Sequence, residues 1–206
     1  MIKNIVFDMG QVLIRFVPRA LAEQEGICEA DMALFLREVF QNKEWVALDR
    51  GSMAEDAAIL SICERLPERL HPAASNIVKG WWKKPLDPVP GMGDLIRELK
   101  GMGYGIYLLS NAPSNLHQYF PRIPGSEFFD GMIVSADWKL LKPEHEIYEK
   151  LFEVYSLAPS ECLFVDDLPI NVDAAIRTGM NGIVFHGDIR RLRRELNAAD
   201  IPVTLS

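Results

Sequence analysis

Cysteine is scarce in this sequence, and its placement argues against a disulfide framework and against zinc binding. Three cysteines, Cys28, Cys63 and Cys162, lie far apart in 206 residues, without a CxxC pair or a neighbouring pair of histidines. Cys162 opens the apolar run CLFV, which favours a buried, inert thiol over a nucleophile. We therefore expect reduced thiols, as in a cytoplasmic protein.

Long apolar runs and an excess of positive charge are also lacking. No uninterrupted apolar stretch reaches the roughly 18 residues of a membrane span, and Asp8 interrupts the first run where a signal peptide would stay apolar. The 22 Lys and Arg residues against 29 Asp and Glu residues give a net charge of −7, which argues against nucleic acid as a partner. We expect a soluble cytoplasmic protein, a monomer or weak homodimer, with no membrane partner.

Short apolar runs that end in polar residues are plentiful, and they predict a parallel sheet. These runs cover residues 2–7, 105–109, 131–134, 162–165 and 182–185. Segments with helical periodicity separate the later runs, at residues 93–102, 144–155 and 171–178. Strands this apolar are buried on both faces, so the pattern predicts an α/β fold: a Rossmann-like parallel sheet core with helices on both faces.

The first two predicted strands are separated by roughly a hundred residues, far more than one crossover helix needs. From Leu21 to about Lys84 this stretch has the pattern of successive amphipathic helices, which predicts an inserted helical-bundle cap. Proline-rich connections at 16–18 and 84–90 are its expected entry and exit. We predict a core domain at 1–17 and 86–206 and a cap domain at 18–85.

Five polar residues at or near the predicted strand ends form the informative set. Asp8, Ser110, Asp166 and Asp167 each follow an apolar run, and Lys142 precedes a predicted helix. Ligands of open parallel sheets bind at the carboxyl ends of the strands, so we expect these side chains to converge there. A carboxylate nucleophile, a hydroxyl, an ammonium and two further carboxylates are the groups that magnesium-assisted phosphoryl transfer needs.

Four segments carry a family resemblance. They are VFDMGQVL at residues 6–13, LLSN at 108–111, KPE at 142–144 and FVDDLPIN at 164–171. In order, spacing and strand placement the sequence resembles the haloacid dehalogenase superfamily of hydrolases, in the branch with a helical (C1-type) cap after the first strand. Within it, the sequence is similar to bacterial sugar-phosphate phosphatases, including the glucose-1-phosphate phosphatase type.

The resemblance implies how the phosphoryl group would be held. Asp8 would attack phosphorus, Lys142 would pair with both Asp8 and the phosphate, and Ser110 and the Asn111 backbone would hold the phosphoryl oxygens. The loop after Asp8, made flexible by Gly10, would add N–H groups around the phosphate.

The resemblance also implies Mg²⁺ as the cofactor. Its ligands would be the Asp8 carboxylate and the Gly10 main-chain carbonyl, with Asp167 bound directly and Asp166 bound through water.

One departure from the family pattern concerns the proton on the leaving group. Family phosphatases usually carry a second Asp two residues after the nucleophile, and here that residue is Gly10. The general acid and base step, worth about 10²–10⁴ in rate, is therefore lost or relocated. Glu44, Asp49 or His71 in the cap are possible substitutes; alternatively, the substrate has a leaving group that scarcely needs protonation, such as a sugar 1-phosphate.

These observations predict a Mg²⁺-dependent phosphatase that hydrolyses a small phosphorylated metabolite, in the first instance a sugar phosphate, through an aspartyl-phosphate. A metal-independent haloacid dehalogenase is one alternative, against which the adjacent carboxylates Asp166 and Asp167 argue, because they need a cation nearby. A catalytically weak phosphometabolite-binding protein is another, and Gly10 is the feature that supports it.

Two further sets of residues have a structural and a functional interpretation. Trp45, Trp81 and Trp82 could stack on a sugar, but we expect aromatic residues of cap helices to serve packing. For Asn171 we favour a helix cap over a catalytic role.

Overall fold

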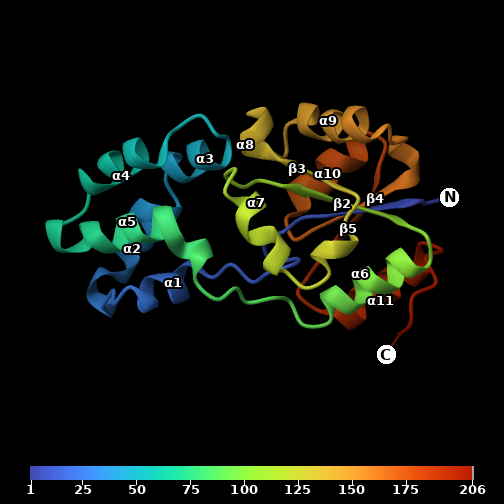
Figure 1. Cartoon of the computed structure of the whole chain (residues 1–206), viewed down its shortest axis with the longest axis horizontal. Helices are drawn as coiled ribbons and strands as arrows, with labels where there is room; N and C mark the ends of the chain where they lie inside the picture. Colours follow the sequence, from blue (N-terminus) through green and yellow to red (C-terminus); the bar gives the residue numbers. More distant parts are fainter. Residues whose placement is uncertain (206) are drawn as a thin grey trace.

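The computed structural model describes residues 1–205 and contains a five-stranded sheet in which every strand is parallel to its neighbours. The strands are β1 (Asn4–Phe7), β2 (Gly105–Ser110), β3 (Gly131–Val134), β4 (Cys162–Asp166) and β5 (Asn181–Val184), in the order β3-β2-β1-β4-β5 (Figure 1). The predicted parallel sheet is confirmed, with each strand end within two residues of its predicted position.

Helices cover both faces of the sheet, as predicted. They are α6 (Met92–Gly101) and α11 (Ile189–Ala198) on one face, and α9 (His145–Tyr155) and α10 (Pro169–Arg177) on the other (Figure 1). The alternation of β1 explains this arrangement, because Ile5 and Phe7 pack with the first pair of helices while Val6 packs with the second. Helices cover both faces, which is why the strands are apolar except at some of their ends.

Five helices between β1 and β2 form a separate bundle beside the sheet. They are α1 (Pro18–Gln24), α2 (Glu29–Phe40), α3 (Lys43–Asp49), α4 (Glu55–Cys63) and α5 (His71–Gly80) (Figure 1). The bundle has its own apolar core, which includes Phe35, Ile62 and Ile77. We call this bundle the cap, and residues 18–85 remain its proposed extent.

The remaining helices are short and lie in connections. They are α7 (Leu116–Tyr119), α8 (Ser135–Trp138) and the 3₁₀ turns η1 (Glu68–Leu70), η2 (Trp81–Lys83), η3 (Phe120–Arg122), η4 (Ser126–Phe128) and η5 (Pro159–Glu161). Within residues 1–205, no helix is long and apolar enough to cross a bilayer.

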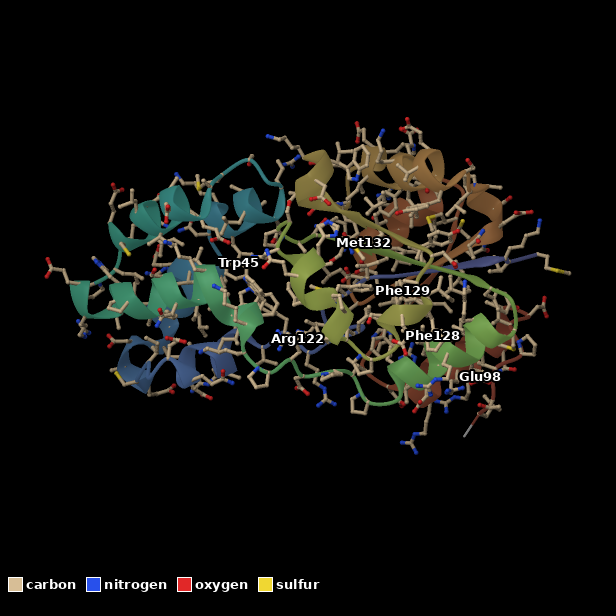
Figure 2. All side chains as sticks on the ribbon, in the orientation of Figure 1. Trp45, Glu98, Arg122, Phe128, Phe129 and Met132 are labelled. Atoms are coloured by element: carbon tan, nitrogen blue, oxygen red, sulfur yellow. The ribbon has the colours of Figure 1, made fainter. Side chains whose placement is uncertain are left out.

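The two linkers between core and cap hydrogen bond to each other. Arg15 N–H donates to the Asp87 carbonyl at 2.7 Å, and Val89 N–H donates to the Leu13 carbonyl at 2.9 Å. This pairing fixes where the chain leaves the core and where it returns. Trp45 of α3 lies where the cap meets the core (Figure 2).

Candidate active site

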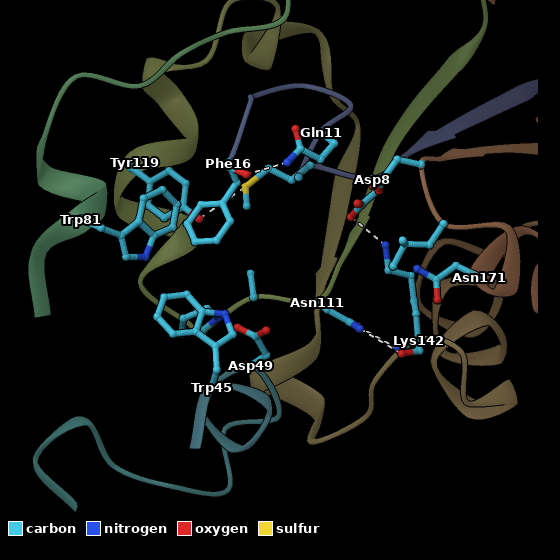
Figure 3. Close-up of a pocket in the computed structure, with 16 residues that line it drawn as sticks. Asp8, Gln11, Phe16, Trp45, Asp49, Trp81, Asn111, Tyr119, Lys142 and Asn171 are labelled. Carbon is cyan, nitrogen blue, oxygen red and sulfur yellow. Dashed lines mark hydrogen bonds and ion pairs between the residues drawn. The ribbon is translucent and has the colours of Figure 1, made fainter. Parts of the chain in front are cut away.

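Three charged side chains meet where β1 and β4 end. Lys142 Nζ lies 2.7 Å from Asp8 Oδ1 and 2.7 Å from Asp166 Oδ2, and all three residues are buried. The Asp8 N–H donates to the Val165 carbonyl at 2.9 Å, which extends the β1–β4 pairing by one residue and fixes the Asp8 backbone. Asp8 is thus held in place and directed toward a cavity (Figure 3).

Burial dominates the acid–base properties of this cluster. Burial raises the pKa of Asp8 to about 7, although the Lys142 ammonium opposes the shift. Burial also lowers the pKa of Lys142, but the carboxylates of Asp8 and Asp166 outweigh that effect, so the pKa is raised. A further cation at this position would lower the pKa of Asp8 and keep it ionised at neutral pH.

Asp8, Asp166 and Asp167 form a set of oxygen donors that fits a divalent cation. Their ligand atoms all lie within 4.8 Å of one another. Burial and the Asp166 charge raise the pKa of Asp167. Three carboxylates face one ammonium, that of Lys142, so negative charge is in excess. Carboxylate oxygens are the ligands that Mg²⁺ prefers, and these residues fit the magnesium that the sequence predicts.

The two carboxylates at the end of β4 have different surroundings. Asp166 is fully buried and accepts hydrogen bonds from Leu168 N–H at 2.8 Å and from the Asn171 amide at 3.1 Å to each oxygen, besides the Lys142 contact. Asp167 is half-buried and lines the cavity. Asp167 is therefore the more accessible donor for a metal, and Asp166 is held by protein groups.

The prediction that Asn171 caps a helix is wrong. Helix α10 begins at Pro169, because proline suits the first helical position, and Leu168 is the N-cap residue. Asn171 therefore lies inside the first turn, where its side chain reaches Asp166 instead of a backbone N–H. Its amide orients the Asp166 carboxylate that in turn binds Lys142.

The loop after Asp8 takes its unusual backbone conformation at Gln11, whose φ is +57°, and Gly10 is not among the residues with positive φ. A Cβ built on Gly10 would have Asp8 Oδ2 as its nearest neighbour, at 4.0 Å. Glycine is thus not required at position 10 by backbone conformation or by space. The Gln11 side chain donates to the Phe16 carbonyl at 2.5 Å and closes the loop.

Ser110 and Asn111 follow β2 at the same edge of the sheet. Ser110 is buried at the end of β2, while Asn111 lines the cavity. The Asn111 amide donates to the Lys142 carbonyl at 2.9 Å and accepts from the Lys142 N–H at 2.8 Å. Asn111 therefore fixes the Lys142 backbone, a function that the sequence did not reveal.

The cavity above Asp8 has a volume of about 290 Å³, and one part of its lining is an aromatic wall. Phe16, Trp45, Trp81 and Tyr119 form this wall, and they come from a linker, α3, η2 and α7 respectively. The ring centroids of Phe16 and Trp81 lie 4.8 Å apart, and those of Trp81 and Tyr119 lie 5.4 Å apart. Trp45 and Trp81 thus pack against other rings and also line the cavity, whereas Trp82 does not line it.

Two of the three candidate substitutes for the missing acid lie away from the cavity. Glu44 is fully buried within the cap, where Ser61 donates to it at 2.7 Å and Arg65 pairs with it at 2.9 Å. The His71 ring is 2.9 Å from the Leu66 carbonyl and does not line the cavity. Asp49, the last residue of α3, lines it (Figure 3).

Comparisons with known proteins agree with this arrangement. The family model for haloacid dehalogenase-like hydrolases matches residues 2–179. A sesquiterpene phosphatase from Aspergillus oryzae is 30% identical over 185 residues, which are 88% of this chain and 88% of that protein. The protein is therefore a hydrolase built on a parallel α/β sheet. More narrowly, the chain belongs to the haloacid dehalogenase-like hydrolase family, as its motifs predict.

Solved structures share the fold. A family enzyme from Bacteroides thetaiotaomicron, in complex with magnesium and inorganic phosphate, is 23% identical, with a TM-score of 0.70 over 93% of this chain and 99% of that chain. The L-2-haloacid dehalogenase of Xanthobacter autotrophicus with chloropropionic acid covalently bound is 20% identical, with a TM-score of 0.66 over 98% of this chain and 84% of that chain. The fold is thus common to an enzyme that binds magnesium and phosphate and to a dehalogenase, and the site residues must distinguish between such functions.

Proposed function

We propose that this hydrolase is a Mg²⁺-dependent phosphatase that hydrolyses small phosphomonoesters through an aspartyl-phosphate on Asp8. The observation that carries the proposal is the buried Asp8 carboxylate, 2.7 Å from Lys142 and beside Asp166 and Asp167, at the floor of a cavity. The phosphatase relative from Aspergillus oryzae supports it.

In this proposal Asp8 Oδ attacks phosphorus and displaces the alcohol of the substrate. Lys142 orients Asp8 and donates to a phosphoryl oxygen, while Ser110 and the Asn111 backbone hold the other oxygens. Asp8, Asp167 and the Gly10 carbonyl would hold Mg²⁺, with Asp166 acting through water. When bound, Mg²⁺ neutralises the charge that otherwise keeps a phosphate dianion away from a carboxylate.

The dehalogenase alternative fits the charges less well. A halide displacement uses one carboxylate and needs no cation, yet here Asp166 and Asp167 stand beside Asp8. Burial, together with the charge of Asp166, raises the pKa of Asp8 and of Asp167, and a raised pKa weakens a carboxylate nucleophile unless a cation binds. A weak binding protein fits less well too, because a binder has no need of a buried nucleophile held by Lys142.

The aromatic wall favours a largely apolar organic group on the substrate. A sugar, as the sequence predicts, has several hydroxyls that need hydrogen-bond partners, whereas four of the lining side chains, Phe16, Trp45, Trp81 and Tyr119, are aromatic and offer few such partners. The Aspergillus oryzae relative, named for sesquiterpenes, points in the same direction. We therefore propose a prenyl or similar apolar phosphomonoester in preference to a sugar phosphate.

Phosphate release from a panel tests both levels of the proposal. The panel contains farnesyl monophosphate, glucose 1-phosphate and 4-nitrophenyl phosphate, each with Mg²⁺ and with EDTA. We expect Mg²⁺-dependent turnover with the highest kcat/KM on farnesyl monophosphate. A higher value on glucose 1-phosphate would overturn the apolar substrate class alone. Absence of phosphate release from all three, or release of halide from a 2-haloacid, would overturn the phosphatase.

A further inference from the structure

The cavity receives one carboxyl group from the cap. Three described residues with a carboxyl group line the cavity. Asp8 and Asp167 belong to the core, and Asp49 is the last residue of α3 in the cap. Asp49 shares the cavity with Gly10, the position at which the sequence lacks the usual acid. Figure 3 shows its carboxylate beside Trp45, directed into the space between the aromatic wall and Asp8.

Contacts at Asp49 and at the two residues after it hold the end of α3 against the core. The Ser135 hydroxyl donates to the Asp49 carbonyl, and the next residue, Arg50, forms an ion pair with Glu144, including an Nη1–Oε2 contact of 3.1 Å. Gly51 follows with a φ of +69°, and a Cβ there would lie only 2.5 Å from the Ala136 carbonyl oxygen. The end of α3 is therefore seated on the core with little freedom to move.

The Asp49 carboxylate itself has no hydrogen bond or ion pair within residues 1–205, unlike Glu44 in the same helix. The charged or titratable groups that face it are Asp8 and the buried Tyr119. Burial raises the pKa of Tyr119, and the charges of Asp49 and Asp8 raise it further. Burial first, and the Asp8 charge second, raise the pKa of Asp49 well above its ordinary value. Asp49 is half-buried, and a carboxyl in a cavity without partners is unfavourable for stability, which is typical of groups kept for function.

We propose that Asp49 is a catalytic residue that donates the proton to the leaving oxygen and later activates water, the work for which Gly10 has no side chain. This inference rests on the proposed phosphatase function. In the first half-reaction Asp8 Oδ forms a bond to phosphorus while the P–O bond to the organic group breaks. The Asp49 proton moves to the departing oxygen, which leaves as a neutral alcohol, and Asp49 becomes a carboxylate.

In the second half-reaction the Asp49 carboxylate takes a proton from water as the water oxygen attacks phosphorus. The bond between Asp8 and phosphorus breaks, and inorganic phosphate leaves. Asp8 is again a carboxylate and Asp49 is again protonated. The net change is hydrolysis of one phosphomonoester, and no co-reactant other than water is needed.

Leaving-group dependence tests this role. A primary alkyl phosphate needs a proton on its leaving oxygen, whereas 4-nitrophenyl phosphate releases a stable anion and scarcely needs one. We expect Asp49→Asn to lower kcat/KM on the alkyl ester by about 10²–10⁴, and on the aryl ester by less than about tenfold. On the aryl ester we also expect a burst of one equivalent of 4-nitrophenol followed by slow turnover, because dephosphorylation of Asp8 loses its base.

The matched control is Asp56→Asn, the same change at an exposed cap carboxylate that pairs with Lys79; it should leave both substrates unaffected. Equal losses of kcat/KM on both esters in Asp49→Asn, or no loss on either, would overturn the role of Asp49. Absence of turnover in the unmodified enzyme would instead overturn the proposed function itself.

A second variant supplies the missing carboxyl from another position and tests the role independently. Gly10→Asp added to Asp49→Asn places a carboxyl at another position that lines the cavity, where the structure has room for a Cβ. On the alkyl ester we expect the kcat/KM of this double variant to be at least about tenfold higher than that of Asp49→Asn alone. A recovery of equal size on the aryl ester would contradict a proton-transfer role.

Discussion

At the scale of single residues, the proposed reaction depends most directly on Asp8, the nucleophile. Asp8→Asn keeps the shape of the side chain but removes the nucleophile, while Lys142 keeps its contact with Asp166 at 2.7 Å. We expect kcat on 4-nitrophenyl phosphate to fall by about 10³ or more with the fold retained. Steady-state phosphate release and circular dichroism together check this prediction. Hydrolysis at the unmodified rate would rule out Asp8 as the nucleophile.

The unequal surroundings of Asp166 and Asp167 predict unequal effects of their removal. Asp167→Ala removes an accessible oxygen donor and should weaken Mg²⁺ affinity by about tenfold or more, with little change in stability. Asp166→Ala instead removes the acceptor of Lys142, Leu168 and Asn171 in a fully buried position, and should lower Tm.

Isothermal titration with Mg²⁺ and thermal unfolding, applied to both variants, separate these effects. A larger loss of Mg²⁺ affinity in Asp166→Ala, with Tm unchanged, would reverse the assignment of the inner ligand.

Strand-end polar residues made most of the site predictable from the sequence. Asp8, Lys142, Asp166 and Asp167 lie together because parallel strands bring their carboxyl ends to one edge. The action of Asn171 on Asp166 was not predictable, because it depends on the helix starting two residues earlier, at Pro169.

The cavity wall could be predicted only in part. Phe16 and Tyr119 lie in a linker and a short helix, and no local pattern marks them as cavity residues. Their position follows from how the cap is seated on the core, which is a tertiary property. The three alternatives for the missing acid likewise needed the structure, since Glu44, Asp49 and His71 all belong to the cap.

At the scale of elements, the junction between α3 and α8 positions Asp49, and Gly51 offers a test of it. Gly51→Ala would place a Cβ 2.5 Å from the Ala136 carbonyl oxygen, so the end of α3 must move away from the core. We expect a lower Tm and a lower kcat/KM on alkyl phosphates, with a smaller effect on 4-nitrophenyl phosphate.

The control for this prediction is Gly26→Ala, in a cap turn with a similar φ of +79° and nothing within 4 Å of the new Cβ. Both variants carry the cost of a left-handed alanine, about 1 kcal/mol, which corresponds to about 2–4 °C in Tm for a chain of this size. Only Gly51→Ala should also change the ratio of alkyl to aryl kcat/KM. The same ratio in both variants would show that the α3–α8 contact does not position a reacting group.

At the scale of the whole molecule, the cavity belongs to neither part alone. The core supplies the charged floor, with Asp8 and Lys142, and the cap and its connections supply Trp45, Asp49 and Trp81. Gathering these groups has a cost, because carboxylates are buried near one another around a single ammonium. That cost makes the stability of the metal-free protein depend on pH.

The sign of this dependence follows from the raised pKa values. Burial raises the pKa of Asp8 to about 7, and the pKa values of Asp49 and Asp167 are also raised, whereas in the unfolded chain such groups ionise near pH 4. Between these values the folded state holds more protons than the unfolded state, so the free energy of unfolding falls as pH rises. Carboxyls with a lowered pKa, such as Glu44 and Glu98, act in the opposite direction but only near and below their ordinary value of 4.5.

We therefore expect the Tm of the protein in EDTA to fall by several degrees between about pH 5 and pH 7.5. Mg²⁺ binds the ionised carboxylates of the folded state, so it should raise Tm more at about pH 7.5 than at pH 5.5. Asp8→Asn should flatten the pH dependence, because it removes the group whose pKa is about 7. Differential scanning fluorimetry across this range checks all three expectations. A Tm in EDTA that rises from pH 5 to pH 7.5 would show that the buried carboxylates are compensated within the protein, and that the site does not need a cation.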